Sequence, residues 1–172
     1  MYRLKDIKGK PVLDGGGVKL GIVQDIVVTL PDYVAYLVVK GEELKKIRGR
    51  LIEYIPVPEI SAINEEVTLY KNIRELGEDI SVINMQELEE YSCGRICGKK
   101  VTSLDGKTLG EINEIGLGEN LKKILINLKI SEGETVKVEF NMVDAVKEDV
   151  KLNYNSFDLK KKISEGEFGT QK

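Results

Sequence analysis

The stretch GKPVLDGGGVKLGIVQDIVV (residues 9–28) occurs a second time in the chain, as GKKVTSLDGKTLGEINEIGL (residues 98–117). The shared positions are mainly glycines, which can supply turns, and apolar residues, which can fill a core. No residue type of catalytic character recurs among them. The matched positions are Gly9, Lys10, Val12, Gly17, Leu20, Gly21, Val23, Asp25 and Ile26 in the first copy, and Gly98, Lys99, Val101, Gly106, Leu109, Gly110, Ile112, Glu114 and Ile115 in the second.

The repetition extends to the end of each copy, where ISAINEEVTL (residues 60–69) matches VDAVKEDVKL (residues 143–152). The offset between the copies falls from 89 residues at the start to 83 at the end, so the first copy carries six additional residues. We expect these near KGEELKKIRGR (residues 40–50), because hairpin loops tolerate insertions.

Each copy has the pattern of short strands separated by glycine-containing turns. KILINLKI alternates apolar and polar side chains strictly, and YVAYLVV is rich in β-branched and aromatic residues. No helical period is present, so each copy predicts a small antiparallel β-barrel of five or six strands. A first predicted strand ends at Val12, and the others cover residues 20–30, 33–39, 49–57 and 65–70 in the first copy, and 109–117, 123–130, 136–143 and 148–153 in the second.

Four glycines define the structural motif of the repeat: Gly9, Gly21, Gly98 and Gly110. Gly21 and Gly110 stand early in a predicted strand, where a glycine usually marks a bulge or a corner at which two backbones approach closely. We therefore predict a structural role for them.

The remaining segments connect or follow the copies. The segment between them has helix-forming composition, and Asn84 with Glu87 could form a capping box. The C-terminal run is polar and glycine-containing, which predicts a flexible tail. The expected organisation is a first repeat over residues 1–70, a partly helical linker over 71–91, a second repeat over 92–157 and a tail over 158–172.

Composition excludes several classes of protein. Hydrophobic residues at 41% and charged residues at 32% indicate a globular chain, and the net charge of −3 predicts no general affinity for nucleic acid. We expect a cytoplasmic protein without membrane insertion, because no stretch reaches the length of a transmembrane helix and the N-terminus lacks a signal-peptide core. Histidine is absent, which excludes Ser–His and Cys–His catalysis, so we expect no enzyme and no cofactor.

The repeated pattern resembles the PRC-barrel family. The residues that carry the resemblance are Ile7, Gly9, Lys10, Val12, Leu20, Gly21, Val23, Asp25, Ile55, Pro56, Ile60, Ile63, Val67 and Leu69 in the first copy, and Gly98, Lys99, Val101, Asp105, Gly106, Leu109, Gly110, Ile112, Val143, Val146, Val150 and Leu152 in the second. The family includes the cytoplasmic domain of the photosynthetic reaction-centre H subunit, the C-terminal domain of a ribosome maturation factor, and stand-alone bacterial and archaeal proteins. The resemblance implies a tandem of small barrels that serves as an adaptor or binding module.

Cys93 and Cys97 are the only cysteines. Two thiolates could contribute to a metal site or act as a redox pair, but two ligands do not complete a tetrahedral zinc site unless a dimer supplies the others. The favoured interpretation is that Cys97 packs as a small apolar residue at the start of a strand and that Cys93 lies near the linker. The few cysteines also agree with a cytoplasmic protein, since a disulfide framework would need more.

Acidic residues near the turns are candidates for a magnesium or calcium site. Their spacing is not that of a calcium loop, and aspartate before glycine is ordinary turn chemistry, which is the favoured interpretation. The DGGG segment leads into a strand and lacks the pattern of a phosphate-binding loop. The acidic residues concerned are Asp14, Asp25, Asp105 and Glu114.

The best candidate for a binding surface lies in the first copy. Its basic run could contact RNA or an anionic surface, although charges also shield sheet edges. Tyrosines, which are frequent in protein interfaces, cluster in the same copy at positions 33, 36, 54 and 70. The binding residues that we predict are Tyr33, Tyr36, Lys40, Lys45, Lys46, Arg48 and Arg50.

The sequence therefore predicts an all-β protein with two tandem barrels and a non-catalytic role. The leading hypothesis is an adaptor that binds another protein. The alternative is an RNA- or ribosome-associated factor, and a weaker alternative is a metal- or redox-responsive protein that uses Cys93 and Cys97. A homodimer is a further expectation, because each barrel alone is small.

Overall fold

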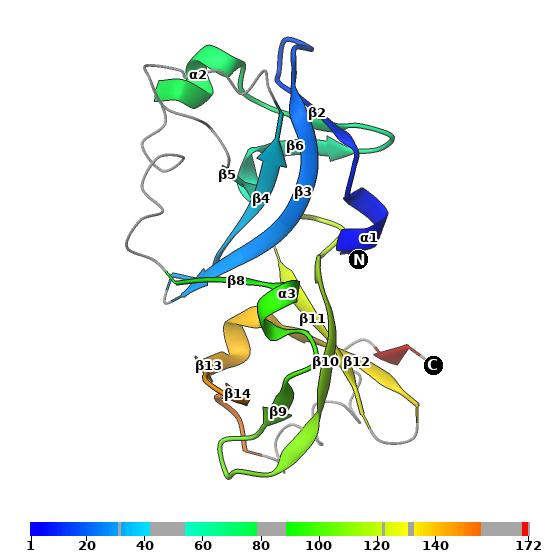
Figure 1. Cartoon of the computed structure of the whole chain (residues 1–172), viewed down its shortest axis with the longest axis vertical. Coiled ribbons are helices and arrows are strands. Elements are labelled where there is room, and N and C mark those ends of the chain that lie inside the picture. The colour runs from blue at the N-terminus through cyan, green and yellow to red at the C-terminus, as the bar shows by residue number, and fades with distance from the viewer. Residues whose placement is uncertain are drawn as a thin grey trace. The chain divides into compact units, whose positions relative to one another are not determined.

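The computed structural model describes residues 1–30, 32–41, 54–78, 89–121, 123–130, 133–155 and 170–171. The chain forms two compact units, which we call the N-terminal unit (Tyr2–Tyr91) and the C-terminal unit (Ser92–Lys172, together with Met1). Strands dominate both units, so the predicted all-β class is confirmed (Figure 1). Within the described residues, no helix is long and apolar enough to cross a membrane.

The N-terminal unit is built on one mixed sheet. Its strands hydrogen-bond in the order β5-β4-β3-β2-β7-β6, and β8 pairs with β3. The elements are β1 (Tyr2–Arg3), α1 (Leu4–Ile7), β2 (Pro11–Leu13), β3 (Lys19–Leu30), β4 (Val34–Lys40), β5 (Tyr54–Pro56), η1 (Val57–Glu59), β6 (Ile60–Ile63), β7 (Val67–Leu69), α2 (Ile73–Glu78) and β8 (Glu89–Ser92).

The C-terminal unit repeats this order of strands. Its sheet runs β13-β14-β9-β10-β11-β12-β15, so β9 to β14 correspond one by one to β2 to β7. The elements are α3 (Cys93–Ile96), β9 (Lys100–Thr102), β10 (Thr108–Leu117), β11 (Ile124–Lys129), β12 (Thr135–Glu139), η3 (Phe140–Met142), β13 (Val143–Val146), β14 (Val150–Leu152) and β15 (Thr170–Gln171).

The sheets differ from the predicted antiparallel barrels in two respects. The pairs β2–β7 and β9–β14 are parallel, which makes both sheets mixed. The sheets are also open, because in the described residues no ladder joins β5 to β6 or β12 to β13. The physical reason is the single 3-10 turn (η1 or η3) between these strands, which redirects the chain; in the N-terminal unit Pro56 and Pro58 also lack the N–H groups that a ladder needs.

The repeated apolar residues fill the core of each unit. Each of these side chains is at most 1% exposed, and burial of such a side chain contributes about 1.5–3 kcal/mol. The corresponding pairs are Ile7 and Ile96, Val12 and Val101, Ile26 and Ile115, Val67 and Val150, and Leu69 and Leu152. The repeat thus encodes the same core twice.

Strand pairing locates the six additional residues of the first copy. Val38 pairs with Tyr54 between β4 and β5, whereas the equivalent pair between β11 and β12 is Asn127 with Lys137. The first connection is six residues longer than the second, which confirms the predicted place of the insertion.

The segment predicted as a linker is only partly helical. Helix α2 lies within it, but residues 89–91 belong to β8, because they pair with β3 instead of continuing a helix. Asn84 and Glu87, predicted as a capping box, lie outside the described residues. In the predicted tail, Thr170 and Gln171 form β15 and pair with β12, and the rest of the tail after residue 155 lies outside the described residues.

Two single-turn helices, α1 and α3, were not predicted. Each spans four residues at the same place in its copy. One helical turn is too short to produce a recognisable period in the sequence.

Candidate functional site

The predicted binding residues do not form one exposed cluster. Tyr33 lies in the β3–β4 turn with its side chain 36% exposed, and Lys40 is exposed at the end of β4. Tyr36 is only 5% exposed and packs edge to face on Tyr54, with 6.4 Å between the ring centroids. Tyr36 is therefore a core residue and not a surface contact. The other predicted contacts, Lys45, Lys46, Arg48 and Arg50, lie outside the described residues.

Burial of Tyr36 makes the N-terminal unit sensitive to alkaline pH. Burial, and secondarily the negative charge of Asp32, raises the pKa of the Tyr36 hydroxyl above its ordinary value. The folded state then holds this proton more tightly than the unfolded state, so the stabilisation is complete below pH ~10 and is lost as the pH rises further. We expect the free energy of unfolding of Tyr36→Phe, measured by urea titration at several pH values, to fall less steeply above pH ~10 than that of the unmodified protein.

The matched control for this experiment is Tyr70→Phe, which removes the same hydroxyl from a ring that is 69% exposed. An equal alkaline slope in Tyr36→Phe and in the unmodified protein would contradict the assignment.

An exposed row of side chains crosses three strands of the N-terminal unit. Ile22 on β3 lies directly opposite Pro11 on β2 and opposite Lys40 on β4. Directly opposite residues present their side chains on the same face of a sheet. Ile22 is 43% exposed, Pro11 is half-buried and Lys40 is exposed. We call Pro11, Ile22 and Lys40 the exposed row.

The C-terminal unit has charged residues at the same three places. Glu111 on β10 lies opposite Lys100 on β9 and opposite Lys129 on β11, and all three are exposed. Such alternating charges are ordinary for the solvated face of a sheet, and opposite charges across strands are favourable. Two copies of one scaffold therefore differ at this position: one presents apolar side chains with a single cation, and the other presents a lysine–glutamate–lysine row.

Other exposed apolar residues follow the same division. Of the five large apolar residues exposed among the described residues, four belong to the N-terminal unit. The counterparts of these four in the second copy are charged or polar. Leu104, the fifth of these apolar residues and the one in the C-terminal unit, corresponds to a glycine in the first copy. The four residues are Val18, Ile22, Tyr33 and Tyr70, and their counterparts are Lys107, Glu111, Lys122 and Asn153.

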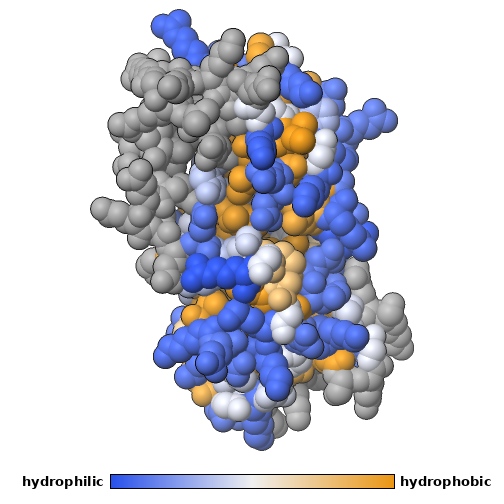
Figure 2. All heavy atoms as spheres, in the orientation of Figure 1, coloured by the Kyte–Doolittle hydropathy of each residue, from blue (hydrophilic) through white to orange (hydrophobic). Residues whose placement is uncertain are grey.

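Val18 and Tyr70 lie at the same end of the N-terminal unit. The Gly15 N–H donates to the Lys71 carbonyl oxygen at 2.8 Å, which joins the turn after β2 to the segment after β7. Val18 is 51% exposed in that turn. Apolar side chains also reach the surface in Figure 2, among a mainly hydrophilic surrounding. The signal that could have revealed these residues was in the sequence, in the positions at which the two copies differ.

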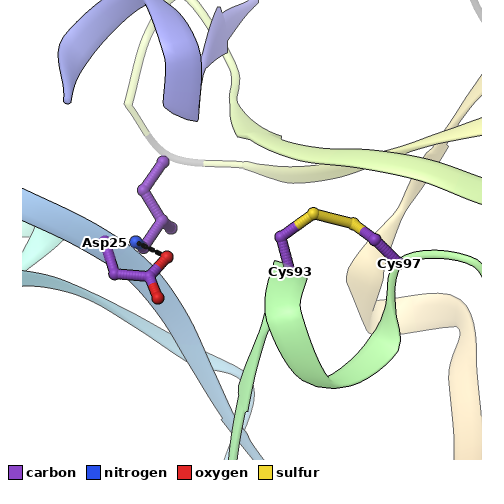
Figure 3. Close-up of a disulfide and its surroundings, with 4 residues drawn as sticks. Asp25, Cys93 and Cys97 are labelled. Atoms are coloured by element: carbon purple, nitrogen blue, oxygen red, sulfur yellow. Dashed lines mark hydrogen bonds between the residues drawn. A yellow bond between two sulfur atoms is a disulfide. The ribbon is translucent and has the colours of Figure 1, made fainter.

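The acidic candidates take part in local hydrogen bonds. The Asp14 carboxylate accepts hydrogen bonds from the backbone of its own turn, Asp25 accepts one from the Ile26 N–H at 2.8 Å (Figure 3), and Asp105 accepts one from the Ser103 hydroxyl at 2.5 Å. Glu114 lies beside the bulge of β10, half-buried. Within the described ranges, no group of three or more potential ligands is arranged to hold a metal ion. Turn chemistry accounts for Asp14 and Asp105.

The glycines of the motif serve the backbone. Gly9 and Gly98 have φ of +88° and +90°, a conformation that favours glycine because it lacks a Cβ atom. Gly21 and Gly110 stand where the neighbouring strand approaches most closely, with the Lys40 and Lys129 carbonyl groups against them. Gly9 and Gly21 therefore position the strands that carry the exposed row, and Gly98 and Gly110 serve the equivalent strands of the C-terminal unit.

Cys93 and Cys97 form a disulfide across α3 (Figure 3). This differs from the expected apolar packing of Cys97. The reason is the helical turn between the two residues, which brings their Cα atoms to 4.8 Å, a separation that a disulfide can span. In this state neither sulfur is a thiolate that could bind a metal ion.

Comparison with known proteins identifies the first repeat. Residues 1–70 match the PRC-barrel domain family. The match ends directly after β7 and so includes the whole exposed row. No curated protein matches the chain. The second repeat shares the strand order of the first, as described above.

Proposed function

We propose that the protein is a non-catalytic adaptor that binds another protein through the exposed row of its N-terminal unit. One observation carries the proposal: the row is Pro11–Ile22–Lys40 in one unit and lysine–glutamate–lysine at the same place in the other. The match of residues 1–70 to a PRC-barrel domain supports a binding role in general.

The chemistry of the exposed row defines the partner that it fits. Ile22 and Pro11 offer apolar area whose burial against a partner is favourable, and Lys40 is the one charged residue of the row. The matching surface is an apolar patch with a carboxylate beside it, because complementary charge orients the partner. A protein surface meets both requirements better than RNA, whose phosphates would leave Ile22 without an apolar contact.

The uneven distribution of exposed apolar side chains between the two units also supports a protein partner, as opposed to a role of these side chains in folding. A single exposed isoleucine needs no explanation in a folded protein. Here, however, four exposed apolar side chains lie on one unit, and the equivalent positions of the other are polar. The same scaffold folds with either set, so the apolar set is not required for folding.

The test is the substitution Ile22→Glu, which installs the residue of the second copy. We expect capture of the partner from lysate of the source to be lost, and binding to that partner, once purified, to weaken at least ~10-fold. The unfolding midpoint should stay close to that of the unmodified protein, because the scaffold already accommodates Glu111 at this place. Isothermal titration calorimetry and urea unfolding measure the two quantities.

The matched control is Leu104→Gly, which removes the exposed apolar residue of the C-terminal unit and restores the residue of the first copy. It should leave capture unchanged. Equal capture by Ile22→Glu and the unmodified protein would refute the proposal. Loss of all captured material on nuclease treatment or at raised salt would favour the RNA- or ribosome-associated alternative instead. If Ile22→Glu instead converts a dimer into a monomer in sedimentation, the protein bound is a second copy of this chain.

A further inference from the structure

We propose that Cys93 and Cys97 form a redox-active pair, whose disulfide exchanges with small thiols in the native protein, and not a structural cross-link. This inference is independent of the proposed protein-binding role, because it concerns the C-terminal unit. It is carried by a comparison between the two copies of the same helical turn.

The backbone closes this turn without help from the disulfide. In α3 the Cys97 N–H donates to the Cys93 carbonyl oxygen at 2.8 Å, and in α1 the Lys8 N–H donates to the Leu4 carbonyl oxygen at 2.8 Å. The first copy therefore makes the same turn with leucine and lysine in the places of the two cysteines.

The surroundings of the two turns also agree. Ile7 and Ile96 are each 0% exposed and anchor the turn in the core of their unit. The glycine after each turn donates to the long strand beside it: Gly9 to the Val23 carbonyl oxygen at 2.8 Å, and Gly98 to the Ile112 carbonyl oxygen at 2.7 Å. In the first copy the turn is also held by the Asp6 carboxylate, which accepts hydrogen bonds from the backbone and the guanidinium of Arg3. The backbone bonds and the apolar anchor of the turn are the same in both copies, so these elements form without the disulfide.

The disulfide also constrains little of the unfolded chain. The stabilisation that a cross-link supplies through chain entropy grows with the length of the loop that it closes. A sequence separation of four residues lies at the short end of that scale. A bond that adds little stability to a turn already formed has the features of an exchangeable disulfide.

The disulfide is not enclosed in the core of the unit. Cys93 and Cys97 are half-buried, while Gly94 and Arg95 between them are exposed. A Cβ atom placed on Gly94 would meet only the Ser92 hydroxyl oxygen, at 3.7 Å, so the turn is not packed against the rest of the chain at this residue. Accessibility of the sulfur atoms separates exchangeable from protected disulfides.

The exchange is balanced as follows. The thiolate of a small thiol attacks one sulfur atom, the bond between Cys93 and Cys97 breaks, and a mixed disulfide forms while the other cysteine leaves as a thiolate. The thiolate of a second small thiol then attacks the sulfur atom that the first small thiol contributed to the mixed disulfide, and the remaining protein cysteine leaves as a thiolate. Two small thiols are oxidised to one disulfide, and the protein disulfide is reduced to two thiols, with two protons and two electrons transferred.

The test uses the full chain in buffers that contain reduced and oxidised glutathione in varied ratio. Alkylation with a maleimide of high mass, read on a gel, reports the fraction of free thiols, and circular dichroism reports the fold. We expect a reversible transition between no free thiols and two, with an unchanged spectrum. A disulfide that millimolar glutathione reduces only in denaturant would overturn the proposal, and so would cysteines that stay reduced in oxidised glutathione.

Two variants keep the outcome interpretable. Cys97→Ser leaves Cys93 alone, and we expect it to accumulate as a mixed disulfide with glutathione, detected by mass. The double variant Cys93→Leu with Cys97→Lys installs the residues of the first copy, and we expect it to fold with an unchanged spectrum. If that variant is unfolded while the oxidised protein is folded, the disulfide is structural and the inference fails.

Discussion

Replacing Gly21 with alanine should lower the free energy of unfolding by about 2–4 kcal/mol, a large effect for one added methyl group. The added Cβ atom would lie 2.6 Å from the Lys40 carbonyl oxygen and 2.9 Å from its carbonyl carbon. Both atoms are backbone atoms of β4, so no side-chain rotation can relieve the clash. The strands β3 and β4, which carry the exposed row, would have to separate locally.

The same substitution in the second copy provides a replicate. A Cβ atom on Gly110 would lie 2.6 Å from the Lys129 carbonyl oxygen, so Gly110→Ala should destabilise the C-terminal unit comparably. Urea unfolding followed by circular dichroism measures the loss. Hydrogen exchange shows which unit loses stability, since amides of β3 and β4 should lose protection in Gly21→Ala and those of β10 and β11 in Gly110→Ala.

Gly16→Ala is the matched control. A Cβ atom on Gly16 would meet only an Asp14 carboxylate oxygen, at 3.5 Å, which is an ordinary contact. Its free energy of unfolding should stay within about 1 kcal/mol of that of the unmodified protein. If Gly21→Ala and Gly16→Ala were equally stable, the close approach of β3 and β4 would not be a rigid feature of the fold.

Local patterns in the sequence predicted the strands well, because alternation and β-branched residues act over neighbouring positions. Strand β11 follows from the alternation of residues 123–130, and the matching repeats located the insertion. The parallel pairs β2–β7 and β9–β14 could not be predicted in this way. They depend on which strands meet after the chain turns at η1 and η3, and no local period encodes that.

The candidate site was predicted less well, because exposure depends on both faces of a sheet. The pattern predicts a contact residue at Tyr36, which belongs to an apolar strand, but Tyr36 lies opposite Val27 and Pro56 on a face that is also buried. Ile22, in contrast, lies in an equally apolar stretch and is exposed. Only the comparison with Glu111 distinguishes the two cases, since a charged counterpart indicates a solvated position.

Asp14→Ala is expected to cost about 2–4 kcal/mol of unfolding free energy, because its carboxylate satisfies three backbone N–H groups. One oxygen accepts from Gly16 at 2.9 Å and from Val18 at 2.7 Å, and the other accepts from Ile73 at 2.8 Å. The Asp14 side chain is buried, with 1% exposure. Alanine would leave these donors without their acceptor in a place that water reaches poorly.

The bond to Ile73 connects this turn to helix α2. Ile73 is the first residue of α2, and the first N–H groups of any helix lack partners within it. Asn72 and Glu75 satisfy two others, since the Glu75 N–H donates to the Asn72 side chain at 2.9 Å and the Asn72 N–H donates to the Glu75 carboxylate at 3.3 Å. Asp14 therefore completes the cap of α2 from a position far away in the sequence.

The second copy indicates a variant that separates the two roles of Asp14. Ser103 stands at the equivalent place, and its hydroxyl accepts a hydrogen bond from the Lys107 N–H at 3.1 Å within its own turn. Asp14→Ser should therefore keep a turn bond but lose the bond to Ile73, since serine is shorter. We expect its stability to lie between those of Asp14→Ala and the unmodified protein, with lost protection confined to the amides of α2.

Asp6→Ala is the control for removing a carboxylate. Asp6 accepts hydrogen bonds from Arg3 at the surface, at 2.9 Å from the Nε atom and at 3.1 Å from the backbone N–H, and such exposed contacts contribute less than buried ones. Its unfolding midpoint should therefore move little, whereas Asp14→Ala lowers it clearly. Should Asp14→Ser and Asp14→Ala prove equally unstable with α2 still protected, the turn alone would account for the effect. The hydrogen bond to Ile73 would then not stabilise the placement of α2. Leu76, which is 0% exposed in the core, would be the residue that anchors the helix.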